Sequence, residues 1–237
     1  MELTSYQLRE TLKRFPDFEL SYETIQHKKV CTNYELCLAI PSGKKYFMWY
    51  TFHRNLDVCY LLEISKQKEI VKGYCVTNSG SYLFSLGTVI YGTLLEETNT
   101  FICEDMYYYQ GVPLKQLNCK DKMYVLKETI KEANKIKYNK KEMSLYLTNM
   151  WKNKQSEITN KIHKEISEKI CYEIHHVQYR SLHETLPFIN IPINQKITAN
   201  VTKEKIENTV IYKTYTCDFK RPQYNYTSIF LVYADIQ

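Results

Sequence analysis

The sequence predicts an α+β fold that is rich in antiparallel strands and has two main helices. Short runs rich in Val, Ile, Thr, Tyr and Phe alternate with turn residues over most of the chain, as in β-strands joined by tight turns. Two longer stretches space their apolar residues by three or four, as one face of an α-helix does. The strands form blocks that these helices interrupt, which is typical of α+β proteins.

The N-terminal half is predicted to be a short helix followed by strands. Residues 5–15 form the helix, because Leu8, Leu12 and Phe15 recur at helical spacing after a Ser cap and Pro16 ends the pattern. The strand-like runs between residues 18 and 107 are "FELSYETI", "YELCLAI", "KYFMWYTF", "DVCYLLEI", "IVKGYCV", "LGTVIYGTLLE" and "TFICEDMYYY".

The C-terminal half is predicted to contain both main helices and further strands. The first helix is indicated by Leu114, Leu117, Met123, Leu126, Ile130 and Ala133, and the second by Ile158, Ile162, Ile166 and Ile170. The later strand-like runs are "YEIHHVQYR", "PFINIPIN", "NTVIYKTYT" and "SIFLVYADI". No repeat, linker or low-complexity segment divides the chain, so we expect residues 1–237 to form a single domain.

Composition indicates a globular protein of the cytoplasm. Of 237 residues, 44% are hydrophobic and 24% charged, which is enough to build a core. The net charge of +6 permits an acidic partner without requiring one. The eight cysteines form no Cys-x-x-Cys pair and no apolar leader opens the sequence, so we expect reduced thiols. The uncharged residues 73–95 contain turn residues and alternate in polarity, so no membrane contact is expected.

The stretch "CLAIPSGKKYFMWYTF", residues 37–52, predicts a hairpin with two cations and several aromatic rings on its second strand. Successive side chains on a strand point to opposite faces, so only one of Lys44 and Lys45 can face a cleft, and Lys45 shares its face with Phe47 and Trp49. An ordinary hairpin with solvated lysines and packed rings is the alternative.

Four stretches carry degenerate motifs in a fixed order. They are "IPSGKK" at residues 40–45, "VIYGTLLEETNTFICEDMYYYQG" with Gly92, Phe101, Asp105 and Gly111, "EIHHVQYR", and "FKRPQYNYTSIFLV" with Lys220 and Arg221. In this order they resemble motifs I, III, IV and V of the nucleotidyltransferase domain of mRNA capping enzymes and ATP-dependent ligases. The chain looks most like the catalytically inert cap-binding relative found in snurportin, and it is also similar to uncharacterised proteins of large nucleocytoplasmic DNA viruses.

The departures from the family pattern imply a protein without catalysis. Ile40 occupies the place of the nucleophilic lysine, and an isoleucine cannot form a lysyl-nucleotide bond. Thr93 replaces the motif III glutamate, and His175 and His176 replace the Asp-Gly pair of motif IV, so carboxylates for Mg²⁺ are missing. We therefore expect no catalytic residue, no cofactor and no metal. The two histidines, adjacent on a strand, should point to opposite faces and not share a metal.

The resemblance implies a site that still holds phosphates, because cations do so without catalysis. Lys45 takes the place of the motif I arginine and is the preferred residue. The other candidates for binding a nucleotide or RNA are Lys44, Trp49, Tyr107, Lys220 and Arg221.

The expected partner is the 5′ end of RNA or a nucleotide, and a viral protein of this kind would act in the viral factory or virion. Two alternatives remain open. The chain is a structural or assembly protein of a virion or transcription complex that uses the fold as a scaffold, or it is an active nucleotidyltransferase with a relocated lysine.

Overall fold

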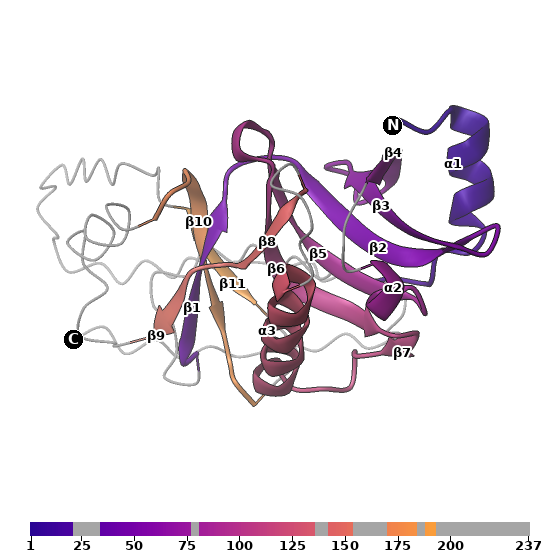
Figure 1. The fold of residues 1–237 in the computed structure, drawn as a ribbon. Coiled ribbons are helices and arrows are strands. Elements are labelled where there is room, and N and C mark those ends of the chain that lie inside the picture. The colour runs from indigo at the N-terminus through magenta and orange to yellow at the C-terminus, as the bar shows by residue number, and fades with distance from the viewer. Residues whose placement is uncertain (21–33, 77–80, 136–141, 154–169, 184–187, 193–237) are drawn as a thin grey trace, which may run out of the picture. The chain divides into compact units, whose positions relative to one another are not determined.

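The computed structural model describes residues 1–20, 34–76, 81–135, 142–153, 170–183 and 188–192 (Figure 1). The chain divides into two units, Met1–Ile197 and Thr198–Gln237, and every described residue belongs to the first. The prediction of an α+β fold rich in antiparallel strands is confirmed. Several predicted elements lie outside the described residues: most of the first strand-like run, the helix over residues 158–170 apart from its last residue, and the last two strands.

The larger sheet has seven strands in the order β4-β3-β2-β5-β6-β7, with β8 paired to β6 beside that path. These strands are β2 (Lys45–His53), β3 (Leu56–Ile64), β4 (Ile70–Val76), β5 (Thr88–Leu95), β6 (Thr100–Tyr109), β7 (Val112–Pro113) and β8 (Ser144–Leu147). Neighbours run antiparallel except β6 and β8, which are parallel. A parallel pair needs a long crossover, and helix α3 (Cys119–Lys135) supplies it.

The smaller sheet has four antiparallel strands in the order β11-β10-β1-β9. They are β1 (Leu36–Pro41), β9 (Met150–Lys152), β10 (Ile174–Arg180) and β11 (Ile189–Pro192). The chain passes from this sheet to the larger one through the turn between β1 and β2, and returns between β8 and β9 (Figure 1). The hairpin predicted for residues 37–52 was therefore wrong, because β1 pairs with β10 and β9 whereas β2 pairs with β3 and β5. Gly43 in the first turn has φ 140°, a backbone conformation that residues with a side chain rarely adopt.

The helices begin at side-chain caps. Helix α1 (Ser5–Leu12) begins at Thr4, which forms a capping box with Gln7, so the predicted cap at Ser5 was wrong by one residue and the helix ends before residue 15. Helix α3 starts after Asn118, whose side chain accepts a hydrogen bond from the amide of Asp121 at 2.9 Å. The remaining helical turns are α2 (Ser81–Phe84) and the 3₁₀ turn η1 (Glu96–Thr98). None of the described helices is long and apolar enough to span a membrane.

Strand β2 lies between two hydrophobic clusters because its side chains alternate. Tyr46, Met48 and Tyr50 pack in the cluster that also contains side chains of α3 and β1. Phe47 and Trp49 lie on the opposite face and pack with the aromatic rings that follow α1. The alternation expected from the sequence is therefore confirmed, and it assigns Lys45 to the face of Phe47 and Trp49.

Candidate functional site

Two β-bulges in β6 set the geometry of the site. Gly92 pairs with Cys103 and Tyr91 pairs with Asp105, so Glu104 is an extra residue on β6. A second register shift leaves Tyr107 as another extra residue. Bulges turn side chains out of the regular alternation and are common beside functional sites. Here they bring Glu104 and Tyr107 to the same cavity as Lys45.

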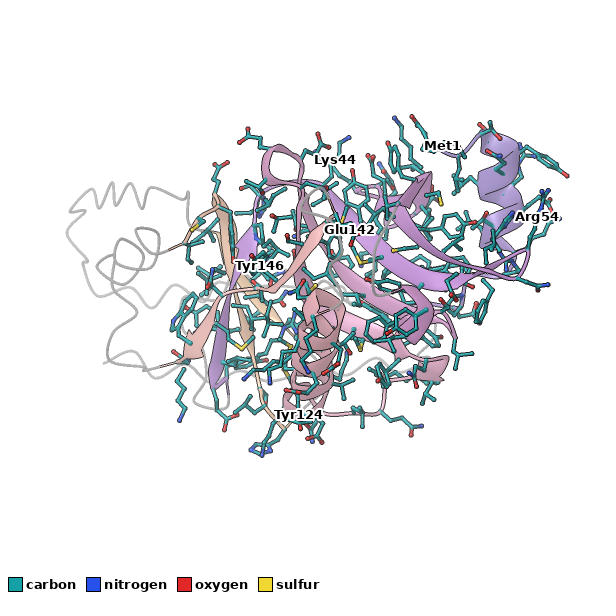
Figure 2. The ribbon with its side chains drawn as sticks, in the orientation of Figure 1. Met1, Lys44, Arg54, Tyr124, Glu142 and Tyr146 are labelled. Atoms are coloured by element: carbon teal, nitrogen blue, oxygen red, sulfur yellow. The ribbon has the colours of Figure 1, made fainter. Side chains whose placement is uncertain are left out.

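Lys45 is held by a buried polar cluster. Its ammonium donates to Glu104 Oε1 and to Thr93 Oγ1, both at 2.6 Å, and the Thr93 hydroxyl also donates to Glu104. The Lys45 side chain is 23% exposed and that of Glu104 only 4%. Lys44, by contrast, is 57% exposed and lies 3.5 Å from Glu63; Figure 2 shows it at the outer edge of the structure. Of the two neighbouring lysines, Lys45 lies inside and Lys44 lies on the surface.

Strand β10 supplies the opposite wall and contains its own bulge. Ile40 pairs with His176 and Pro41 pairs with Ile174, so His175 is the extra residue. The two imidazoles therefore meet, with their Nδ1 atoms 2.8 Å apart. The expectation that these histidines point to opposite faces was wrong, because it assumed a regular strand.

His176 is the inner member of this pair. Burial, together with the charge of Lys45 and the neighbouring His175, lowers the pKa of His176 to about 3, so its ring is neutral at physiological pH. Its Nε2 atom is buried and has no hydrogen-bond partner among the described residues.

Arg180, at the end of β10, is the most deeply buried cation of the site, with 3% of its surface exposed. The guanidinium donates to Gln178 Oε1 at 2.8 Å, to the backbone oxygen of Glu104 at 3.0 Å, and to the sulfur of Met123 at 3.8 Å. It also lies over the ring of Phe188, 4.2 Å from the centroid. Across the described ranges, Arg180 forms no ion pair with a carboxylate.

Lys122 on α3 forms the second lysine–carboxylate pair of the site. Its ammonium lies 3.0 Å from Asp105, and both side chains are largely buried. The same ammonium lies over the ring of Tyr107, 5.6 Å from the centroid. Burial, followed by the charge of Asp105, raises the pKa of the Tyr107 hydroxyl, which therefore stays protonated.

These side chains enclose a small cavity between strands of the two sheets, with a volume of about 40 Å³. Its lining residues are Ile40, Lys45, Tyr91, Glu104, Asp105, Tyr107, His176, Gln178, Arg180 and Phe188. Pockets that enclose a whole small molecule usually measure roughly 300–1,000 Å³. The cavity therefore accommodates a group of a few heavy atoms.

Some of the predicted site residues line the cavity and others do not. Lys45 and Tyr107 line the cavity, whereas Lys44 does not. Trp49 is 2% exposed and packs edge-on against Phe15, with the ring centroids 5.1 Å apart. The ring of Trp49 is therefore part of the core, and Trp49 does not line the cavity. Lys220 and Arg221 lie outside the described residues.

Arg180, Glu104 and Phe188 were missed by the sequence analysis. Arg180 ends the stretch "EIHHVQYR", but nothing in that pattern distinguishes a buried arginine from a solvated one. In the part of the chain that the structure describes, no three His, Cys, Asp or Glu side chains are grouped so that they could hold a metal ion.

Comparisons with known proteins do not assign the chain to a family. No family model matches it, and no curated protein is significantly similar to it.

Proposed function

We propose that this protein binds the 5′ end of RNA or a nucleotide through the cavity, without catalysing nucleotidyl transfer. The observation that carries the proposal is the buried Arg180 guanidinium, which lines the same cavity as Lys45 and lacks a carboxylate partner within the described residues. A buried cation of this kind favours an anionic ligand, and phosphate is the anion that arginine matches best.

The arrangement of the strands supports the proposal. Lys45 comes from the stretch that resembles motif I, Glu104 and Asp105 from the one that resembles motif III, and His176 and Arg180 from the one that resembles motif IV. These stretches lie far apart in the sequence, yet side chains from all three line one cavity. In the resembled family, the same motifs surround a nucleotide.

RNA binding is tested with a double substitution, Lys45→Gln with Glu104→Gln, which removes both charges of this ion pair and so leaves neither partner charged alone. We expect this variant to bind RNA about tenfold or more weakly than wild type, the effect of losing one charged hydrogen bond. Fluorescence anisotropy with capped and uncapped oligonucleotides and competition with GTP measure this. Lys44→Gln is the matched control, because it removes a neighbouring charge from the surface, and it should bind as wild type does.

The absence of catalysis is tested by labelling. The place of the family's nucleophile is occupied by Ile40, which is 1% exposed and apolar, and Lys45 is held by Glu104. We expect the protein to remain unlabelled after incubation with radioactive GTP or ATP and Mg²⁺ or Mn²⁺, followed by denaturing electrophoresis. A labelled band that is lost in Lys45→Arg but kept in Lys44→Arg would show instead that the nucleophile has been relocated.

A scaffold role is the second candidate, and the size of the cavity favours it. A volume of about 40 Å³ is small for a nucleotide site. If wild type binds neither RNA nor GTP at physiological salt, the polar cluster is a structural feature of the core, and an assembly protein becomes the better description.

A further inference from the structure

Two cations and two carboxylates line the cavity, and Lys122, which pairs with the lining residue Asp105, brings the charged cluster to one positive charge more than its carboxylates neutralise. Glu104 is paired with Lys45 at 2.6 Å and Asp105 with Lys122 at 3.0 Å. Arg180 meets only neutral acceptors within the described ranges. Because the two carboxylates are already engaged by lysines, they oppose an incoming anion only weakly, whereas the guanidinium attracts it.

In one of its two neutral tautomers, His176 adds a neutral donor to the same cavity. One proton is shared between the Nδ1 atoms of His175 and His176, which lie 2.8 Å apart. When His175 donates this proton, His176 carries its own proton on Nε2, the buried nitrogen without a partner in the described part of the chain. A buried N–H needs an acceptor, so in this tautomer His176 Nε2 would donate to an acceptor that enters the cavity.

The volume of the cavity restricts the ligand to a compact group. About 40 Å³ is enough for a few heavy atoms but not for a base and a ribose. The aromatic ring of Tyr107, which lines the cavity, is already in contact with other side chains. Tyr107 is in edge contact with Phe47, and the ammonium of Lys122 lies over its ring.

We propose that the cavity recognises a compact oxyanion, the terminal phosphate of an RNA 5′ end or of a nucleotide, and leaves the base outside. Arg180 and Lys45 supply charged donors, and His176 supplies a neutral one. This inference rests on the proposed function and narrows it, because a free 5′ phosphate rather than the guanine of a cap becomes the recognised group.

The test uses the full chain and four RNA oligonucleotides of one sequence that differ only at the 5′ end: hydroxyl, monophosphate, triphosphate or guanosine cap. The two RNAs with a free terminal phosphate should bind about tenfold or more tightly than the other two, as expected for a charged hydrogen bond. Inorganic phosphate, at constant ionic strength, should compete with them.

Three variants test the donors. Arg180→Gln should remove the preference for a 5′ phosphate, and His176→Phe should reduce it by about two- to tenfold. Arg54→Gln makes the same change as Arg180→Gln at the exposed turn between β2 and β3 (Figure 2), and it should leave the preference intact. Since Arg180 is buried, Arg180→Lys is compared as well. It keeps the charge but loses the guanidinium fork, and it should retain only part of the preference.

The outcomes separate this inference from the proposed function. Equal binding of all four RNAs overturns the phosphate assignment but leaves RNA binding in place. Binding of inorganic phosphate without binding of any RNA or nucleotide keeps the oxyanion site and overturns the proposed function. If no probe binds wild type, both are overturned, and this comparison does not depend on any variant folding.

Discussion

Replacing Lys45 with alanine is expected to lower the free energy of unfolding by about 3–5 kcal/mol, the usual cost of leaving one partner of a buried ion pair alone. The substitution removes the cation that neutralises Glu104, whose side chain is 4% exposed. It also removes the donor to Thr93. Urea denaturation, followed by circular dichroism, measures the change.

Two further variants test whether the loss of stability comes from the unpaired Glu104 carboxylate or from any substitution in this part of the strand. Lys44→Ala removes the neighbouring charge, but that side chain is 57% exposed and its pair with Glu63 is 3.5 Å long, so the loss should stay below about 1 kcal/mol. The double variant Lys45→Met with Glu104→Gln should recover much of the lost stability, because neither member of this ion pair remains charged. Equal losses for Lys44→Ala and Lys45→Ala would contradict the buried ion pair.

Replacing Gly92 with alanine is expected to lower the free energy of unfolding by about 4 kcal/mol or more. Losses this large are typical of substitutions that collide with the backbone or core. A Cβ atom at this position in β5 would collide with the backbone oxygen of Ile102 and would lie 2.9 Å from the ring of Phe101. Both belong to β6, next to the bulge at Glu104. A backbone oxygen inside a paired strand cannot move aside as the end of a side chain can.

Gly73→Ala is the matched control for Gly92→Ala. Gly73 is also buried in a strand, β4, but its Cβ would meet the ends of the Leu8 and Leu3 side chains at 2.9 and 3.0 Å. These leucines can rotate, so the loss should be about 1–3 kcal/mol, the usual cost of overpacking. Thermal unfolding of both variants provides the comparison. If Gly92→Ala loses no more stability than Gly73→Ala, the result contradicts the close approach of β5 and β6 at Gly92.

The periodic parts of the fold were predictable because their signals are local. The alternation of residues 45–50 was enough to place Lys45 on the same face as Phe47 and Trp49, since side chains on a regular strand alternate. Likewise, the spacing of Met123, Leu126 and Ile130 predicted the buried face of α3.

The irregular parts of the site could not be predicted from the sequence in the same way. An extra residue in β6 or β10 changes which way Glu104 or His175 points, and only the pairing with the neighbouring strand shows where it occurs. The burial of Arg180 depends on contacts with α3 and β6, which are distant from it in sequence. For Trp49, strand alternation predicted the face on which the ring lies, but not that Phe15, in the segment after α1, would pack over it.

The pairing of β1 with β10 has a consequence for how the protein folds. The hairpins β2–β3, β3–β4 and β5–β6 join neighbours in the sequence, whereas residues 36–41 pair with residues 174–180. Closing so long a loop costs chain entropy before any contact repays it, and contacts of this kind slow folding. The hairpins are therefore expected to form first and the smaller sheet later. Since β10 carries His176 and Arg180, the cavity is completed only in the closing steps of folding.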